Sequence, residues 1–334
     1  MIQEIQQNPL VSVFIPSYNH SRYIQTTLEG IFAQTYRNIQ LIIIDDGSTD
    51  NSPEIIEKAL KNCPFESELI VRPNKGIVPT LLEGLAMARG EYFASTASDD
   101  LWLPNFLERR VAQLQENHNA VLAYGHCFRI DENDKVIDSS SDWVEYGSKS
   151  SREELLELTV PQSSTIVHRK SVLDSHPWSQ SYPEDLDLYL RLCSLGEFVF
   201  DSQINSAYRI HPTNTSKQVE PMLKGLINVY QLNAVNLGLN PDELNIIKRR
   251  IEWHTVVTYL NNGQRVKAIK AALRNSSGEI SFIERMRQYS KILIPSSILT
   301  ATRKRIKRNS NQWRGLDVKD LMKAQAATRK IYHA

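Results

Sequence analysis

The 334-residue sequence has few cysteines and no long apolar run. Its three cysteines, Cys63, Cys127 and Cys193, are widely separated and form no CxxC pair, which argues against a disulfide framework or a cysteine-ligated zinc site. No stretch approaches the ~18 apolar residues that a membrane-spanning helix needs. The N-terminal MIQEIQQNPL lacks the basic and apolar regions of a secretory signal. We therefore expect a cytoplasmic protein with reduced thiols.

The sequence also lacks an excess of charge of either sign. Lysine and arginine total 39 and the acidic residues 38, so the formal net charge is only +1. No basic surface interleaved with aromatic residues is evident outside the C-terminal end, and we expect no nucleic-acid partner. Apolar residues make up 41% of the chain, which is ordinary for a globular protein long enough for one large α/β domain and an appendage.

Short apolar runs alternate with helical patterns through the first hundred residues. Strands are expected over 11–15, 39–44, 68–72 and 92–96, and helices over 24–34, 53–60 and 76–88. Such alternation is typical of parallel βαβ units, whose ligands bind beyond the carboxyl ends of the strands. Acidic side chains follow two of these strands directly.

The pattern changes in the second half of the chain. Shorter strands are expected over 121–124, 165–168 and 198–200, followed by helices alone over 222–236, 241–261 and 265–273. We place a domain boundary near residue 216, which separates an α/β domain (1–216) from a helical C-terminal region (217–334).

Two acidic pairs follow predicted strands. Asp45-Asp46 precedes Gly47 and could either accept hydrogen bonds from a ligand or form a solvated turn. Asp99-Asp100 offers hard oxygen ligands that suit Mg²⁺ or Mn²⁺. The alternative for Asp100 is an N-cap of a helix over 101–111.

A third acidic pair, Glu184-Asp185, follows Pro183 at the start of a predicted helix. Acidic residues favour a helix N-terminus because of its dipole, but a carboxylate beside a pocket can also act as a general base. His211 lies in the segment YRIHP, and a single histidine is more often structural than a metal ligand.

Seven motifs in order carry a family resemblance. They are VSVFIPSYN (11–19), DDGSTDNS (45–52), NKG (74–76), ARGEY (88–92), SDD (98–100), PED (183–185) and YRIHPTNTS (208–216). Over about residues 9–216 the chain resembles the family 2 glycosyltransferases. The resemblance implies a GT-A (Rossmann-like) α/β fold, with a mixed, mainly parallel sheet flanked by helices, and here an α-helical C-terminal extension.

The resemblance also implies a nucleotide-sugar site that uses Mn²⁺ or Mg²⁺. Asp46 corresponds to the residue that binds the nucleobase. Asp99 is expected at the ribose or a bound water, and Asp100 at the metal with His211. The remaining nucleotide-binding candidates are Pro16, Ser17 and Tyr18, which would line the pocket, and Arg72 and Lys75, which would contact the phosphates.

Asp185 corresponds to the family's catalytic base, and Glu184 to its orienting or acceptor-binding neighbour. The segment 161–165 resembles the loop that lines the acceptor site. One base and a metal-bound leaving group imply a single in-line displacement that inverts the anomeric carbon. A UDP-sugar is the default donor in this family, and the acceptor would be a hydroxyl of a glycan or lipid-linked saccharide in surface polysaccharide synthesis.

The segment 285–308 contains eight lysines or arginines and no acidic residue, interleaved with apolar side chains. This pattern is typical of helices that bind an anionic membrane surface, which would place the protein on the inner face of the cell membrane. A solvated helical face, or packing on a second subunit of a homo-oligomer, is the alternative.

Two other functions compete with a transferase. A phosphotransferase of the haloacid dehalogenase type requires the pattern D-x-D-x-T, and Ile44 occupies the position of its first acid. A non-catalytic module that binds nucleotide sugars is the other alternative, and the presence of all three acidic pairs argues against it.

Overall fold

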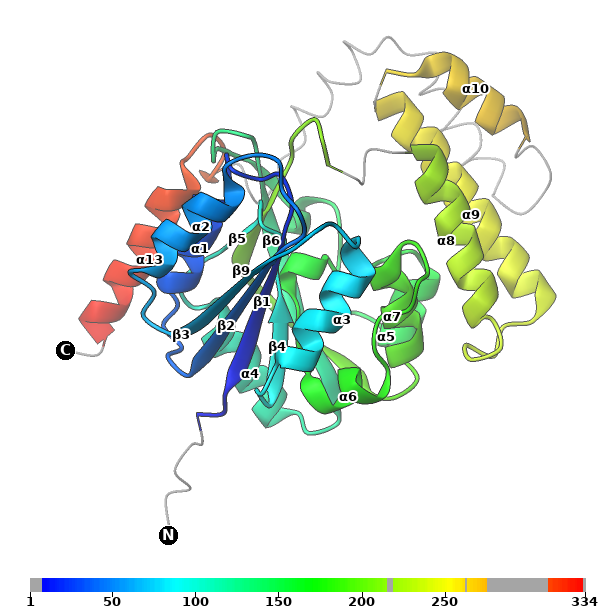
Figure 1. Ribbon diagram of the computed structural model, residues 1–334. Helices are drawn as coiled ribbons and strands as arrows, with labels where there is room; N and C mark the ends of the chain where they lie inside the picture. The colour runs from blue at the N-terminus through cyan, green and yellow to red at the C-terminus, as the bar shows by residue number, and fades with distance from the viewer. Residues whose placement is uncertain (1–7, 215–218, 262, 275–311, 333–334) are drawn as a thin grey trace.

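The computed structural model describes residues 8–214, 219–261, 263–274 and 312–332. A mixed sheet flanked by helices forms its centre (Figure 1), with strand order β3-β2-β1-β4-β8-β6-β9-β5 and β7 paired to β6. The strands are β1 (Val11–Ser17), β2 (Ile39–Asp45), β3 (Glu66–Val71), β4 (Tyr92–Ser95), β5 (Leu101–Trp102), β6 (Ala120–Ile130), β7 (Val136–Ser139), β8 (Val167–Arg169) and β9 (Glu197–Arg209). The mixed sheet that the resemblance implies is confirmed.

The first four strands are parallel, as the alternating pattern predicts. Alternate residues of β1 enter different cores: Val13 and Ile15 pack beneath α1 (Ile24–Phe32) and α2 (Ser52–Leu60), whereas Phe14 packs beneath α3 (Ile77–Met87). Because both faces are covered, β1 and β2 are apolar throughout rather than alternating. The helices cover the faces of the sheet and not the carboxyl ends of these strands, where the loops that follow β1 and β2 begin.

The later strands are longer than the sequence pattern predicts. β6 and β9 pair in parallel along most of their length, although only 121–124 and 198–200 are continuously apolar. Polar side chains interrupt the pattern, and the structure satisfies them internally: Asp201 pairs with Arg109 at 2.7 Å and with Arg110 at 2.8 Å. Hydropathy therefore underestimates strands that contain buried ion pairs.

The expected helix over 101–111 is also wrong at its start. Residues 101–102 form β5, which pairs antiparallel with β9, and α4 (Phe106–Glu116) begins only afterwards. The other elements of this half are η1 (Ser140–Asp142), α5 (Ser151–Leu156), η2 (Ser163–Thr165), α6 (Lys170–Ser175) and α7 (Glu184–Leu192).

The C-terminal helices pack in two places. One group consists of α8 (Val219–Asn233), α9 (Pro241–Asn261) and α10 (Arg265–Arg274). It contacts the α/β domain through α8 and α7, where Asn233 donates to Asp187 at 2.9 Å. In contrast, α13 (Val318–Tyr332) returns to the α/β domain and lies beside α1 (Figure 1), and Val318 packs with Leu101, Phe128 and Ala207. The described helices of the C-terminal region thus pack in two different parts of the molecule.

No helix in the described ranges is both long and apolar enough to cross a membrane. The basic segment 285–308 lies outside the described residues.

Candidate active site

Three loops meet at the carboxyl ends of β1, β2 and β4. The loop after β1 is tied to the loop after β2, because the backbone nitrogen of Asn19 donates to Ser48 Oγ at 2.8 Å and that of His20 to Ser52 Oγ at 3.0 Å. His20 Nδ1 also lies 2.7 Å from Ser98 Oγ in the loop after β4. The strand order therefore brings the first two acidic pairs to one edge of the sheet.

Asp46 anchors the loop that follows β3. Its buried carboxylate accepts hydrogen bonds from the backbone nitrogens of Lys75, at 2.8 Å, and Gly76, at 2.9 Å. The Arg72 guanidinium also donates to it. Gly76 has φ of 87°, a conformation that residues with a Cβ rarely adopt. Asp46 and Arg72, both nucleotide-site candidates, are thus in direct contact.

The remaining candidates of this subsite differ in exposure. The Lys75 side chain is about half exposed and its Nζ lies 3.2 Å from Glu83, while Tyr18 is 48% exposed. Ser17 is buried, and its hydroxyl donates to Asp45 at 2.9 Å rather than facing solvent. Pro16 is partly buried within β1. Tyr18 and Lys75 therefore have side chains accessible to a ligand, whereas Ser17 supports the loop.

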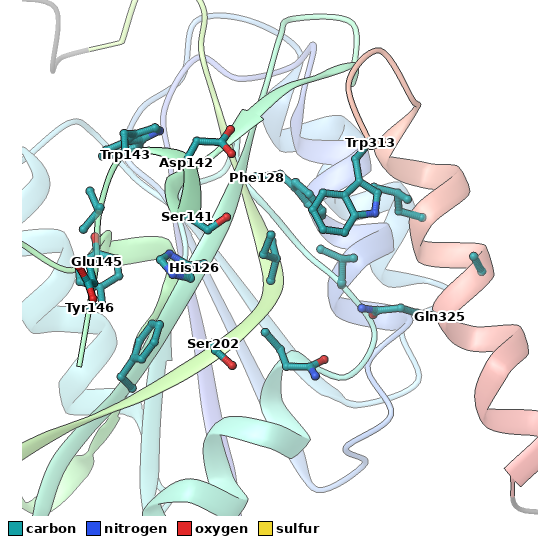
Figure 2. Close-up of a pocket in the computed structure, with 17 residues that line it drawn as sticks. His126, Phe128, Ser141, Asp142, Trp143, Glu145, Tyr146, Ser202, Trp313 and Gln325 are labelled. Carbon is teal, nitrogen blue, oxygen red and sulfur yellow. The ribbon is translucent and has the colours of Figure 1, made fainter. Parts of the chain in front are cut away.

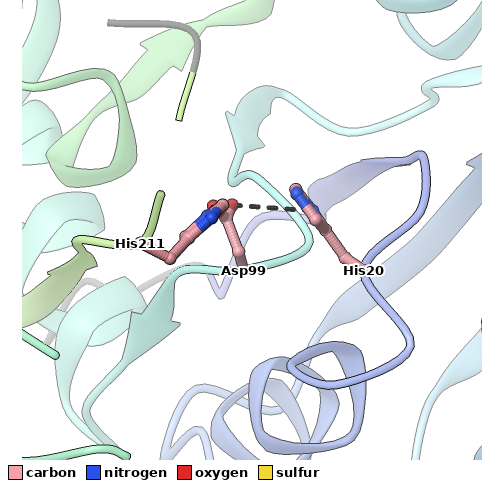
Figure 3. A group of neighbouring side chains, drawn as sticks. All are labelled: His20, Asp99 and His211. Carbon is pink, nitrogen blue, oxygen red and sulfur yellow. Dashed lines mark hydrogen bonds and ion pairs between the residues drawn. The ribbon is translucent and has the colours of Figure 1, made fainter. Parts of the chain in front are cut away.

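Asp99, His211 and His20 form a compact group of possible metal ligands (Figure 3). Asp99 Oδ2 lies 2.7 Å from His211 Nε2, Asp99 Oδ1 lies 3.8 Å from His20 Nδ1, and one ligand atom from each residue falls within 4.8 Å of the others. His211 Nδ1 lies 2.8 Å from Thr213 Oγ1, which orients the ring. His20 comes directly after the YN of the first motif, a signal that the sequence interpretation did not use.

The protonation states suit cation binding. Burial lowers the pKa of His20 below its usual value, although the charge of Asp99 partly opposes this. Burial works against ionisation of Asp99, but its hydrogen bond with His211 and its contact with His20 outweigh burial and lower the pKa of that carboxyl. Neutral imidazole and ionised carboxylate are the forms that bind metals.

Asp100 points away from this group. Its Oδ1 accepts a hydrogen bond from the backbone nitrogen of Arg209 at 2.9 Å, and burial, followed by the nearby charge of Asp99, raises its pKa well above the usual range. The expected division of roles, with Asp99 at the ribose and Asp100 at the metal, stays a prediction, but in this geometry Asp99 rather than Asp100 lies beside the two histidines. Adjacent residues in a loop turn their side chains in different directions, which the order of the motif cannot show.

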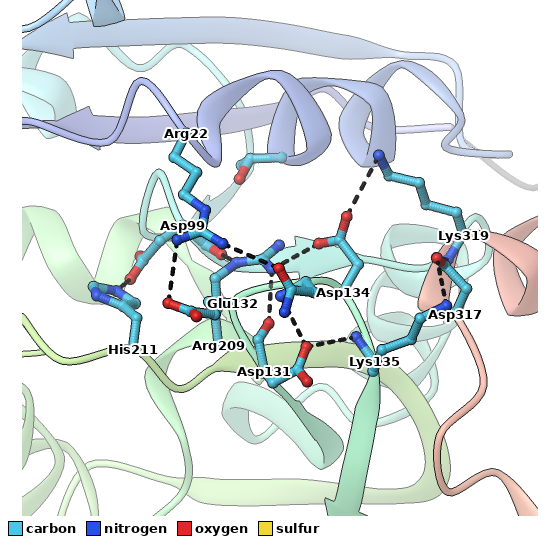
Figure 4. A network of polar contacts seen from close by, with 12 residues as sticks. Arg22, Asp99, Asp131, Glu132, Asp134, Lys135, Arg209, His211, Asp317 and Lys319 are labelled. Carbon is cyan, nitrogen blue, oxygen red and sulfur yellow. Dashed lines mark hydrogen bonds and ion pairs between the residues drawn. The ribbon is translucent and has the colours of Figure 1, made fainter.

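Arg209 holds the loop that carries both acids (Figure 4). Its buried side chain donates to the backbone oxygens of Asp99 at 2.7 Å and Asp131 at 3.0 Å, and pairs with Asp134 at 2.6 Å. The guanidinium also lies over the Tyr23 ring, 4.8 Å from its centroid. A buried guanidinium needs acceptors and a negative charge nearby, and these contacts supply them. Because His211 comes two residues after Arg209, the same contacts fix the position of Asp99 relative to His211.

The third acidic pair lies at the start of α7. Trp178 Nε1 donates to Asp185 Oδ1 at 3.4 Å. Burial raises the pKa of Asp185, and burial together with the charge of Asp185 raises the pKa of Glu184 to about 7. The hydroxyl of Ser163 in η2 favours the ionised form of Asp185. Asp185 therefore lies beside the segment 161–165.

A cavity of about 370 Å³ lies between the His211 loop and the segment before η2. Tyr208, Ile210 and Asn214 line it from the first side, and Val160 and Gln162 from the second. The segment 161–165, which we expect to line an acceptor site, thus borders a cavity next to the possible metal ligands.

Comparison with solved structures shows the class of fold that this architecture defines. The chain is similar to Staphylococcus aureus TarS residues 1–349 in complex with UDP-GlcNAc, with a TM-score of 0.59 and 18% identity over 77% of this chain and 76% of that one. It is also similar to the mannosyltransferase PcManGT of Pyrobaculum calidifontis in complex with GDP-Man and Mn²⁺, with a TM-score of 0.57 and 15% identity over 98% and 88% of the two chains. The fold is that of GT-A glycosyltransferases.

Residues 12–176 match the family described as Glycosyl transferase family 2, and the chain belongs to this family. An uncharacterised glycosyltransferase of Nostoc is 32% identical over 49% of this chain and 52% of that protein, and the chondroitin synthase of Escherichia coli is 30% identical over 70% and 34%. The chain thus spans about half the length of these relatives or less. The family match does not support the alternative of a phosphotransferase of the dehalogenase type.

Proposed function

We propose that this protein transfers a sugar from a nucleotide-sugar donor to a hydroxyl group of a glycan or lipid-linked saccharide and inverts the anomeric carbon. One observation carries the proposal: the small cavity is lined on one side by Ile210 and Asn214, which adjoin His211, and on the other by Gln162, which precedes Ser163 beside the Asp185 carboxyl. A site for the departing diphosphate and a base for the incoming hydroxyl are therefore close together. The GT-A fold and the family support this assignment.

The donor site combines a nucleobase end and a diphosphate end. Asp46 and Arg72, which contact each other beside the loop after β3, are suited to hydrogen-bond the polar edge of a base. Lys75 lies in the same loop with a half-exposed side chain and would pair with phosphate oxygens. UDP is our proposed nucleotide, supported by the similarity of the fold to a structure that contains UDP-GlcNAc.

The residues present fit a divalent cation. Asp99, His211 and His20 supply one carboxylate and two imidazoles, a donor set that suits Mn²⁺ better than Mg²⁺, which prefers oxygen ligands and retains several waters. When bound, such a cation stabilises the negative charge that develops on the leaving diphosphate. We therefore assign the ligand role to Asp99 rather than Asp100, and leave Asp100 the role of holding the Arg209 backbone.

Asp185 is the proposed general base. A partly buried carboxyl with a raised pKa is better matched to removing a proton from a hydroxyl near neutral pH than a fully solvated one. Trp178 orients the carboxyl from one side, and Glu184 lies beside it with a pKa of about 7. Glu184 is suited to hydrogen-bond the acceptor, because in its protonated form it donates as well as accepts.

The reaction and its stereochemistry test the proposal together. The purified protein is incubated with Mn²⁺, a panel of UDP- and GDP-sugars and saccharide acceptors, and products are followed by mass spectrometry. Proton NMR of the product gives the anomeric configuration, which we expect to be opposite to that of the donor. Binding of donors without any turnover would instead identify a nucleotide-sugar-binding module, and a retained configuration would contradict the single displacement.

The basic segment 285–308 supports a second, separate proposal from the sequence alone, that the protein binds an anionic membrane surface. Sedimentation with vesicles that contain phosphatidylglycerol should retain the wild-type protein and release a full-length variant in which the lysines and arginines of 285–308 are replaced by glutamine. Equal retention of both proteins contradicts it. A change of oligomeric state in the variant would instead support subunit packing.

A further inference from the structure

A second and larger cavity, of about 1,070 Å³, lies between the C-terminal part of the sheet and α13 (Figure 2). Phe128 on β6 and Phe200 on β9 form part of its wall, Trp143 flanks it on one side, and Trp313 and Gln325 flank it on the other. Trp313 packs edge-on against Phe128, with ring centroids 5.3 Å apart. The volume exceeds the roughly 300–1,000 Å³ of typical ligand pockets, so more than one sugar unit fits.

Polar groups are distributed among these aromatic surfaces. Gln325 Oε1 is buried and has no hydrogen-bond partner among the residues that the structure describes, and Gln203 contributes a second amide. Figure 2 shows Gln325 extending from α13 toward the cavity. A buried acceptor without a partner is costly, and a ligand hydroxyl would satisfy it. Aromatic faces combined with amide groups suit a sugar, which presents apolar C–H faces and a ring of hydroxyls.

The charges of the wall restrict which sugars fit. Among its described lining residues the only charged side chains are acidic, Asp142 and Glu145, and there is no lysine or arginine. His126 adds no positive charge near neutral pH, because burial, and then the charge of Arg110, lowers its pKa to about 4. A chain of uronic acids would be repelled here, whereas an uncharged glycan would not.

The large cavity shares lining residues with the small cavity beside the candidate active site. Trp143 and Tyr146 line both this cavity and the smaller one beside the His211 loop. Along β6, His126 and Phe128 face the large cavity and Cys127 and Arg129 the small one, so the two lie on opposite sides of the strand. Trp143, which is 54% exposed, stands at the boundary between them.

We propose that the large cavity is a distal subsite for the acceptor, and that it holds an uncharged oligosaccharide segment whose reacting end passes Trp143 into the small cavity. This inference rests on the proposed function for the identity of the acceptor. It specifies an acceptor chain of several neutral sugars, held by stacking on Trp313 and by hydrogen bonds to Gln325.

Direct binding tests the subsite without any need for turnover. The full-length protein is titrated with neutral tetrasaccharides (β-1,4-linked glucose, N-acetylglucosamine and galactose) and with a chondroitin tetrasaccharide, and binding is followed by saturation-transfer NMR and calorimetry. We expect at least one neutral tetrasaccharide to bind and the anionic one not to. Trp313→Ala should weaken that binding about tenfold or more.

Two further variants separate recognition from folding. Gln325→Leu keeps the bulk of the side chain and removes its amide, so it should weaken binding while the melting temperature is unchanged. Lys323→Ala alters an exposed residue of the same helix and should bind as the wild type does. Binding of no neutral tetrasaccharide, or equal binding by wild type, Trp313→Ala and Gln325→Leu, overturns the subsite. Glycan binding by a protein that transfers no sugar would refute the proposed function and leave the subsite intact.

Discussion

Asp99 and His211 are 112 positions apart in the sequence, yet Asp99 Oδ2 and His211 Nε2 lie 2.7 Å from each other. The contact joins the loop after β4 to the loop after β9, strands that are separated in the sheet by β8 and β6. Arg209 fixes both sides, because its side chain binds the Asp99 backbone and its own backbone nitrogen binds Asp100. The two adjacent acids are therefore expected to differ sharply in function.

A pair of substitutions tests this difference. Asp99→Ala removes a proposed ligand and should weaken Mn²⁺ binding by at least about 100-fold, since loss of an outer-shell partner already costs ~10–100-fold. Asp100→Asn keeps an oxygen that accepts from Arg209 and should bind Mn²⁺ as the wild type does. Calorimetric titration with Mn²⁺ measures both. If Asp100→Asn weakens Mn²⁺ binding more than Asp99→Ala does, Asp100 rather than Asp99 is the metal ligand.

His20 provides an independent test of the same group. His20→Ala removes one of the two imidazoles near Asp99 and should weaken Mn²⁺ binding, with a smaller loss for Mg²⁺ because imidazole contributes less to its affinity. His118→Ala is the matched control, since His118 is exposed and lies on the turn after α4. If Mn²⁺ affinity is equal in the two variants, His20 is not a ligand.

The base assignment predicts a specific loss of rate. Asp185→Asn preserves the shape of the side chain and removes its ability to accept a proton, so kcat should fall by about 10²–10⁴-fold. The Kd of the donor should be unchanged, because Asp185 lies at the proposed acceptor side. Steady-state kinetics and donor titration measure the two quantities. Asp174→Asn on the exposed face of α6 is the control, and an active Asp185→Asn enzyme removes Asp185 from the mechanism.

The contact between Asp46 and Arg72 predicts a linked loss of donor affinity and stability. Asp46→Ala leaves two backbone N–H groups and a largely buried guanidinium with one acceptor fewer. The free energy of unfolding should fall by roughly 1–3 kcal/mol. Donor affinity should fall about tenfold, equivalent to about 1.4 kcal/mol. Urea unfolding measures the loss of stability, and donor titration measures the loss of affinity. Glu57→Gln on the exposed side of α2 is the control. Unchanged donor affinity in Asp46→Ala would remove Asp46 from the nucleotide site.

The sequence predicts the first half of the fold well because its strands are apolar on both faces and its helices are amphipathic. The predicted strand over 11–15 and the observed β1 differ by two residues. β9 could not be predicted in full, because Asp201 and Arg209 interrupt its apolar pattern and are satisfied only by residues distant in sequence. The orientation of a side chain within a loop is likewise set by long-range contacts, so the acidic pairs could be located but Asp99 and Asp100 could not be told apart.

The raised pKa of Glu184 predicts a pH dependence of stability. Burial and the charge of Asp185 raise its pKa to about 7, whereas in the unfolded chain a glutamate titrates near ~4.3. Between these values the folded state binds more protons than the unfolded state, so the free energy of unfolding falls as the pH rises through this window.

The variant Glu184→Gln tests this pH dependence, because the glutamine side chain is uncharged at every pH and should flatten this part of the stability profile. Urea midpoints across the window measure the effect, and Glu157→Gln, at an exposed position, should leave the slope unchanged. A Glu184→Gln profile as steep as that of the wild type would place the Glu184 carboxyl in contact with solvent and remove the physical basis for its role beside Asp185.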